Sequence, residues 1–507
     1  MNVEVSFCYL QLQSLRIILH QATLTKPSAK LCARCGPAVK GNIDPGTDEV
    51  QQVQDILSFK IDFVIWNRGR NFYPQIQHMI KQFLLTACLL ACISFLPAQP
   101  VLKPGAPQQN HFSPERLKRI DNLIQQYIDS NWIAGAIALV AKDGNIVYHK
   151  AMGFDDKEKN KPLQKDAIWR IASQTKAITS VGVMILYEEG KLLLDDPISK
   201  YIPEFRKPLV LDKFNKADTT YTTVPAKKEI SIRELLTHTS GIDYAQIGSA
   251  TMNAIYAKAG VMGGIGMNGG THLADNIKKL ASLPLAHQPG EKFTYGLNTD
   301  VLGYLIEVLS GMSLDQFFHK KIFEPLGMND TYFYIPSEKK NRLAMLHSED
   351  KNRKVVNTEK QIDVNGVFNR DYPVIEGGSF YSGGGGLVST AYDYALFMQM
   401  LLNKGIYNGK RLLSANTVEL MTMNQIGDIN IGRFNKFGLG FEVVTANGKP
   451  RTVLSQGTFS WGGMFASSYW IDPKEKIVAQ FVLQQYPFTH GEIADKFKVA
   501  VYQALEQ

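Results

Sequence analysis

Apolar and polar positions change their spacing between residues 114 and 150. Residues 114–128 place apolar side chains three or four positions apart, which predicts an amphipathic helix. Two extended runs follow at residues 134–141 and 145–150, separated by Lys142-Asp143-Gly144. Two such runs joined by a short turn that contains glycine indicate a β-hairpin.

The far end of the chain carries a similar pattern in the reverse order. Runs at residues 438–444, 465–471 and 477–483 indicate strands, and residues 492–505 indicate a closing helix. Between the two ends, residues 172–402 are dominated by helical and loop patterns. We therefore expect an α/β (α+β) fold: an antiparallel sheet formed by N- and C-terminal segments and flanked by helices, with an inserted, mainly helical subdomain.

An apolar run stands alone near the end of the first hundred residues. Phe83–Leu96 follows Met79-Ile-Lys81 and precedes Pro97-Ala98-Gln99. A short basic segment, an apolar run and a small residue at a cleavage point are typical of a secretory signal. The run is too short to span a bilayer comfortably. We interpret residues 79–98 as a signal peptide and expect an exported protein, periplasmic or extracellular, with no stable membrane span in the mature chain.

This interpretation sets the expected domain boundaries. Signal peptides begin at the N-terminus, so we interpret residues 1–78 as a misassigned N-terminal extension, with a genuine extra segment as the alternative. Residues 99–112 are rich in proline, glycine and glutamine and are expected to form a linker. Residues 113–507 then form one domain.

Composition and charge restrict the class of protein. The 507 residues are 45% hydrophobic and 20% charged, which is typical of a globular protein and excludes wholesale disorder. The net charge is +8, but acidic residues stand beside the basic clusters. We therefore expect solvated surface at these clusters and no nucleic-acid partner.

The cysteines lie at one end of the chain. All five fall within the first 92 residues, at Cys8, Cys32, Cys35, Cys88 and Cys92, so the rest can hold no disulfide and no thiolate metal site. Cys32 and Cys35 form a CxxC without the second pair that a zinc site needs. The ten histidines form no HExxH pattern. We expect no metal and no cofactor. Lipoprotein anchoring through Cys88 or Cys92 is the second alternative for localisation.

A Ser-x-x-Lys pair puts a hydroxyl and an amine one helical turn apart on the same face. The chain contains three such pairs, beginning at Ser173, Ser337 and Ser348. The second and third lie in charged stretches where the lysines would be hydrated. Ser173 and Lys176 instead open a strongly apolar helix. Burial there would let the amine lose its proton and act as a base for the serine, which favours the first pair.

Six sequence blocks follow one another along residues 113–507. They are Arg170–Lys176, Glu234–Gly241, Phe293–Gly303, Pro325–Asp330, Gly383–Thr390 and Trp461–Gly463. Together they resemble the serine β-lactamase-like superfamily, with the family-VIII carboxylesterases and related acyl transesterases as the nearest branch. The resemblance implies a nucleophile at Ser173, a base at Lys176 and a second proton-relay group at Tyr295. It also implies an oxyanion hole from the backbone N–H groups of Ser173 and Met464.

Two blocks depart from the pattern of the penicillin-recognising members. Those members usually carry Tyr-x-Asn, whereas here Leu297 occupies that position and Asn298 follows one residue late. They also usually carry Lys-Thr-Gly on the edge strand, where this chain has Trp461-Gly462-Gly463. We expect Trp461, Gly462, Gly463 and Asn298 to bind the substrate, with a preference for uncharged groups because Trp461 replaces a cation.

The sequence thus predicts a secreted serine hydrolase that acts through an acyl-enzyme on small-molecule esters, as a carboxylesterase or an acyl transesterase does. No GxSxG motif accompanies His238, so we interpret this histidine as structural rather than as the base of a Ser-His pair. A β-lactamase or D-alanyl-D-alanine peptidase, with a lactam or amide substrate, is the alternative on the same fold. A non-catalytic envelope-binding protein on the same scaffold is the alternative from another functional class.

Overall fold

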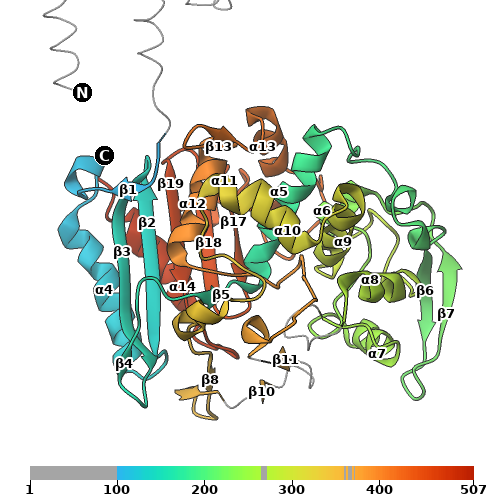
Figure 1. Ribbon diagram of the computed structural model, residues 1–507, viewed down its shortest axis with the longest axis horizontal. Helices are drawn as coiled ribbons and strands as arrows, with labels where there is room; N and C mark the ends of the chain where they lie inside the picture. Colours follow the sequence, from blue (N-terminus) through green and yellow to red (C-terminus); the bar gives the residue numbers. More distant parts are fainter. Residues whose placement is uncertain (1–99, 264–270, 359–360, 363–367, 370, 507) are drawn as a thin grey trace, which may run out of the picture. The chain divides into compact units, whose positions relative to one another are not determined.

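A nine-stranded, mostly antiparallel sheet brings the two ends of the described chain together (Figure 1). The structure is a computed structural model that describes residues 100–506 except 264–270, 359–360, 363–367 and 370. In spatial order the main path of the sheet is β1 (Lys103–Pro104), β3 (Asn145–Asp156), β2 (Gly135–Lys142), β19 (Ile477–Val482), β18 (Ser467–Asp472), β17 (Phe459–Gly463), β16 (Glu442–Val443) and β15 (Lys436–Phe437), with β4 (Lys161–Pro162) beside β3. The pairing of β2 with β19 joins the N-terminal hairpin to the C-terminal strands and confirms the expected fold class.

Both faces of the sheet are covered, and β2 shows why its sequence is almost continuously apolar. Ala136, Ala138 and Val140 belong to the core under helices α4 (Pro114–Asp129) and α14 (Glu492–Tyr502). Their neighbours Ile137, Leu139 and Ala141 belong to the larger core on the opposite face, where α5 (Thr175–Glu188) and α12 (Ala391–Leu402) contribute buried side chains. Successive side chains of a strand point to opposite faces, so both sets are buried.

The helical part of the chain lies on the right of Figure 1. It contains α6 (Ile232–Leu236), α7 (Ala250–Lys258), α8 (Leu273–Ala281), α9 (Asn298–Ser310) and α10 (Leu314–Phe318). Helix α9 packs against α5 and so connects this part to the sheet. A hairpin of β6 (Leu209–Phe214) and β7 (Tyr221–Pro225) stands at its outer end, in the region where helical and loop patterns dominate the sequence. Its strands are largely exposed, so they lack the apolar alternation that would have revealed them.

Several element boundaries differ from the expected ones; the strand expected at 145–150, for example, extends to Asp156. The strand expected at 438–444 is reduced to β16, because Gly440 has a φ of +97° and a tight turn closes between Gly438 N and Phe441 O. The strand expected at 465–471 starts at Ser467, since Met464 and the two residues after it form the turn that follows β17. The closing helix ends at Tyr502.

The residues expected to form a linker belong to the folded domain where the structure describes them. Strand β1 pairs with β3, and Phe112 is fully buried in the core beneath α4. The backbone N–H of Ser113 then donates to Ala504 O at 2.8 Å. The interpretation of residues 99–112 as a linker is therefore wrong for residues 103–112. The expected signal peptide, the extension before it and Gln99 lie outside the described residues.

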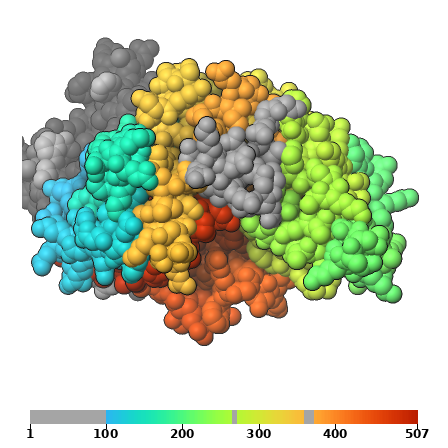
Figure 2. Space-filling view, turned by 90° about the horizontal axis from the view of Figure 1, so that it is seen from below, coloured from blue at the N-terminus to red at the C-terminus, as the bar shows by residue number. Residues whose placement is uncertain are grey.

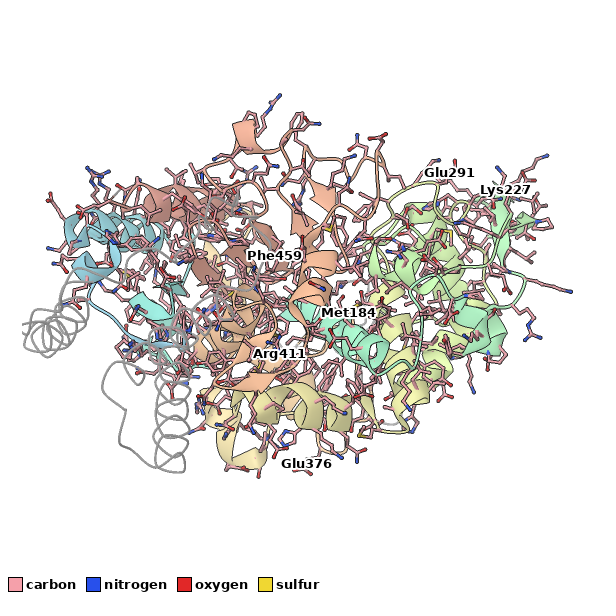
Figure 3. The ribbon with its side chains drawn as sticks, turned by 90° about the horizontal axis from the view of Figure 1, so that it is seen from above. Met184, Lys227, Glu291, Glu376, Arg411 and Phe459 are labelled. Atoms are coloured by element: carbon pink, nitrogen blue, oxygen red, sulfur yellow. The ribbon has the colours of Figure 1, made fainter. Side chains whose placement is uncertain are left out.

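Figure 3 labels side chains both in the interior and at the outer end of the helical part. Met184 on α5 and Phe459 on β17 lie in the interior and are almost fully buried. Lys227 and Glu291 lie at the outer end of the helical part. Across the described ranges, no helix combines the length and the apolar character needed to cross a membrane.

Candidate functional site

Ser173 and Lys176 lie where strand β5 (Trp169–Arg170) passes into helix α5. Ser173 stands in the short 3-10 turn η2 (Ala172–Gln174) that precedes α5. Ala172 is fully buried and has a φ of +45°, a left-handed conformation that is uncommon for a residue with a Cβ. Residues held in such conformations cluster at functional sites, and here Ala172 directly precedes the candidate nucleophile in the sequence.

The Lys176 amine has three polar neighbours. Its Nζ lies 3.2 Å from Ser173 Oγ, 2.7 Å from the Tyr244 hydroxyl and 2.6 Å from the carbonyl oxygen of Gly384. The residue is only 3% exposed. A neutral amine has two N–H groups and one lone pair, so it can donate to Gly384 and Tyr244 while its lone pair faces Ser173. This arrangement is the geometry that a general base for the serine requires.

Tyr244 is a site residue that the sequence did not reveal. It follows the Glu234–Gly241 block by three positions, and no spacing rule connects it to the Ser-x-x-Lys pair. Burial raises the pKa of Tyr244 well above 10, with further increases from Tyr295 and Asp300, while a hydrogen bond with Ser173 opposes them. The hydroxyl therefore stays protonated at neutral pH and can pass a proton between its neighbours.

The structure brings Tyr295 to the same cluster, in a different position from Tyr244. The centre of its ring lies 4.7 Å from Lys176 Nζ and 5.3 Å from the centre of the Tyr244 ring. Its hydroxyl accepts a hydrogen bond from Trp461 Nε1 at 3.3 Å. Tyr295 thus connects the lysine to the edge strand β17. Its role as a proton relay stays a prediction.

Asn298 lies behind the site instead of in it. The side chain is 0% exposed, and its Nδ2 contacts His238 Nδ1 at 3.0 Å and Ile242 O at 3.3 Å. Its Oδ1 accepts from Ser240 Oγ. Because both ends of the amide are bound within the protein, the expected substrate contact of Asn298 is wrong. The one-residue shift from Tyr-x-Asn places the amide on the inner side of the first turn of α9.

His238 completes this internal network and supports Tyr295. Its ring centre lies 4.8 Å from that of Tyr295, and its Nδ1 also accepts from the backbone N–H of Gly296 at 3.4 Å. Burial, and secondarily the charge of Lys176, lowers the pKa of His238 well below 6.5, so the imidazole is neutral. A neutral ring that accepts through Nδ1 is bound as part of the structure, in agreement with the interpretation from sequence.

Replacing Asn298 by alanine is expected to weaken the fold more than substrate binding. The change leaves Ser240 Oγ and His238 Nδ1 buried without the amide, which costs about 1–3 kcal/mol for an unsatisfied group. Urea unfolding should show this loss, while KM for a short ester stays within about twofold of the wild-type value. A tenfold rise in KM at unchanged stability would contradict this placement of Asn298.

A cavity of about 1050 Å³ opens over the serine. Six of its lining residues are expected site residues: Ser173, Tyr295, Trp461, Gly462, Gly463 and Met464. Figure 2 shows the face of the molecule on which a hollow lies between orange residues of the C-terminal part and green residues of the helical part. Tyr295 and Phe437 pack around Trp461, with ring centres 5.4 and 5.3 Å away, which makes this wall of the cavity aromatic.

The strand edge beside the serine is open. Among the described pairings, β16 covers β17 only at Phe459 and Ser460, which leaves the edge at Trp461–Gly463 free. A Cβ on Gly463 would lie 2.6 Å from Ile171 O, so only glycine allows this strand to approach the turn that carries Ser173. Ser173 and Met464 line the same cavity. Their N–H groups stay the predicted oxyanion hole.

The other two Ser-x-x-Lys pairs lie away from this cavity. Ser337 begins a short 3-10 helix, η6 (Ser337–Arg342), that has no buried residue. Ser348 lies in the small hairpin strand β8 (His347–Glu349), and Lys351 is exposed. Neither serine lines the cavity over Ser173. Within the residues that can be described, no group of three or more histidine, cysteine or acidic side chains is arranged to hold a metal ion.

The chain is similar to several known hydrolases and acyltransferases. It is 31% identical over 364 residues to the esterase EstB of Burkholderia gladioli. The aligned region covers 70% of this chain and 86% of EstB. Among solved structures, EstCE1, "a hydrolase with promiscuous acyltransferase activity", superposes with a TM-score of 0.65 at 27% identity, over 76% of this chain and 99% of EstCE1. The simvastatin synthase LovD of Aspergillus terreus shares the fold, with a TM-score of 0.64 at 22% identity, over 78% of this chain and all of LovD.

Sequence and geometry agree on the family. The family model described as Beta-lactamase matches residues 120–503, which include the Ser173–Lys176 pair, both tyrosines and the open edge of β17. The relatives with this fold include an esterase and a hydrolase with acyltransferase activity. The chain therefore belongs to the beta-lactamase family, whose fold is that of serine hydrolases.

Proposed function

We propose that the protein is a serine acyl hydrolase that acts on uncharged esters through an acyl-enzyme at Ser173. The observation that carries the proposal is the 3.2 Å contact between Lys176 Nζ and Ser173 Oγ at the floor of a large cavity. The similarity to EstB, which is named as an esterase, supports ester substrates.

The first half of the proposed reaction acylates the serine. Neutral Lys176 takes the proton of Ser173 Oγ as this oxygen attacks the ester carbonyl, and the N–H groups of Ser173 and Met464 stabilise the resulting oxyanion. Each such donor contributes about 2.7–4 kcal/mol to lowering the barrier. The C–O bond to the alcohol then breaks. The alcohol leaves with the proton that Lys176 received, and we propose that Tyr244 and Tyr295 pass this proton on.

The second half returns the serine. Water, or a second alcohol in a transesterification, gives its proton to the Lys176–Tyr244 pair as its oxygen attacks the acyl carbonyl. The bond to Ser173 Oγ breaks, and the serine regains a proton. The acid or the new ester leaves. One set of groups therefore serves both steps, first as base and then as acid.

Substrate preference follows from the edge strand. A cation at the position of Trp461 would form a charge-assisted hydrogen bond with the carboxylate of a penicillin, worth about 1.5–3 kcal/mol. Trp461 supplies no charge, and its indole N–H is already bound to Tyr295. We expect p-nitrophenyl acetate and butyrate to react faster than benzylpenicillin, as measured by kcat/KM. Efficient turnover of benzylpenicillin without esterase activity would instead establish the β-lactamase or peptidase alternative.

Two variants at Trp461 make this test sharper. Trp461→Leu removes the ring and adds no charge, while Trp461→Lys removes the ring and adds a cation. The ratio of benzylpenicillin to butyrate activity should be about tenfold higher in the lysine variant than in the leucine variant, because 1.4 kcal/mol is a factor of ten. Equal ratios would show that charge at this strand position does not set the preference.

The remaining alternative and the localisation are separate proposals. A non-catalytic binding protein would not react with a fluorophosphonate, since covalent labelling requires an activated serine.

Export is proposed from the signal-like residues 79–98, with the periplasm or the outside of the cell as the destination.

A further inference from the structure

A buried carboxylate near the lysine has no place in the reaction described so far. Asp300 lies in the first turn of α9 and is 1% exposed. Its Oδ1 accepts from Ser382 Oγ at 2.6 Å and from the backbone N–H of Gly384 at 3.3 Å. Its Oδ2 is buried and has no hydrogen-bond partner among the described residues. Burying a carboxylate is costly, which calls for an explanation of this placement.

The partners of Asp300 lie in the glycine-rich turn that reaches the lysine. Gly384 donates its N–H to Asp300 and offers its carbonyl oxygen to Lys176 Nζ at 2.6 Å. The neighbouring carbonyl of Gly383 accepts from Thr179 Oγ1 at 2.7 Å. The turn is therefore held from two sides, by α5 through Lys176 and Thr179 and by α9 through Asp300.

Close packing leaves this turn little freedom. A Cβ on Gly384 would overlap Asp300 Oδ2, and a Cβ on Gly383 would lie 2.7 Å from Thr299 O. Only glycine fits at either position. The hydrogen bonds of the turn thus set the direction of the Gly384 carbonyl. One of them, from the Gly384 N–H to Asp300 Oδ1, fixes the backbone of Gly384 itself.

We propose that Asp300 is a positioning residue for acyl transfer, which holds the Gly384 carbonyl against Lys176 and so directs the lone pair of the amine at Ser173. A carbonyl oxygen can only accept, so one N–H of the amine must point to Gly384. Tyr244 takes the second N–H, and the remaining direction faces Ser173 Oγ. The inference rests on the proposed function of the Ser173–Lys176 pair.

The Asp300 carboxylate also affects the electrostatic environment of Lys176. Among the described titratable groups, Tyr244 and Tyr295 contact Lys176, while neutral His238 and Asp300 on α9 interact with it electrostatically. Losing a nearby negative charge moves the pH dependence of a reaction that needs a neutral base toward lower pH. Burial raises the pKa of Asp300 itself, while Ser382 and Lys176 oppose that increase.

Three variants separate position from charge. Asp300→Asn keeps an acceptor for Ser382 and Gly384 but removes the charge. Ser382→Ala keeps the charge but removes one hydrogen bond of the turn. Asp300→Ala removes both. The matched control is Asp393→Asn, because Asp393 is a buried carboxylate in the first turn of α12 whose partners are Asp330 N and Thr331 Oγ1.

The experiment measures kcat, KM and the pH dependence of kcat/KM for p-nitrophenyl butyrate, with rates divided by the fluorophosphonate-reactive fraction. Misplaced catalytic groups cost up to about 100-fold. We expect kcat to fall about 100-fold in Asp300→Ala and about tenfold in Ser382→Ala, with KM within twofold. In Asp300→Asn the rising limb of the pH profile should move to lower pH, as expected for losing a nearby negative charge. Asp393→Asn should change neither kcat nor the pH profile.

Two outcomes would overturn the inference. One is a wild-type kcat in Ser382→Ala together with a wild-type pH profile in Asp300→Asn. The other is an equal loss of kcat in Asp393→Asn, which would reveal a general effect on folding. If Asp300→Ala does not fold, the other two variants decide. Failure of the proposed function gives a different result, since the wild-type chain would then form no acyl-enzyme.

Discussion

Replacing Ser173 by alanine should abolish covalent labelling by a fluorophosphonate and lower kcat for esters by about 10⁶-fold, as the loss of a nucleophile does in serine hydrolases. In the proposed reaction the Ser173 hydroxyl, 3.2 Å from Lys176 Nζ, receives the acyl group, so its removal leaves the reaction without its nucleophile. Labelling followed by mass spectrometry of the peptides, with ester turnover measured in parallel, checks both effects.

The chain supplies its own matched controls for this substitution. Ser337→Ala and Ser348→Ala remove the hydroxyls of the other two Ser-x-x-Lys pairs, which lie outside the cavity. Both variants should label and turn over like the wild type. A label on Ser337 or Ser348, or full activity in Ser173→Ala, would contradict the assignment.

Replacing Tyr244 by phenylalanine should lower kcat by about 10²–10⁴-fold, the range typical of a lost proton-transfer group. The change removes the hydroxyl 2.7 Å from Lys176 Nζ and leaves the ring in place. Lys176 then loses one of its three polar neighbours and, in the proposed reaction, the group that passes its proton on. Steady-state kinetics of p-nitrophenyl butyrate hydrolysis over a range of pH measures the effect.

Tyr256→Phe is the control for the loss of a buried hydroxyl. Tyr256 is almost fully buried, its hydroxyl accepts from the backbone N–H of Asp243 at 3.3 Å, and it is not one of the three polar neighbours of Lys176. This variant should lose stability and keep kcat. If Tyr295→Phe lowers kcat by a much larger factor than Tyr244→Phe, the two tyrosines have exchanged the roles given to them here.

The order of the elements could be read from the sequence because it depends on local patterns. The amphipathic spacing of residues 114–128 and the two runs around Gly144 became α4 and the hairpin of β2 and β3. The same reasoning failed at 438–441, where a glycine with positive φ makes a turn within an apolar run. It also missed β6 and β7, whose exposed side chains follow no alternation.

The sequence predicted those parts of the candidate site that lie within short motifs. Ser173 and Lys176 are one helical turn apart, so their contact follows from spacing alone. Tyr244 and Gly384 reach Lys176 from 68 and 208 positions away, and only the packing of α5 against the helical part brings them there. Asn298 shows the reverse error. Its position beside a motif suggested a substrate contact, but the phase of α9 turns the amide inward.

The most direct test of the central claim is to trap the acyl-enzyme. The purified chain is mixed with p-nitrophenyl butyrate, quenched in acid within the first turnover and measured as intact protein and as peptides. The account predicts a burst of p-nitrophenol equal to the amount of active enzyme, and one butyryl group on the peptide that contains Ser173. Turnover without a burst and without any acylated peptide, or acylation at another residue, would contradict it.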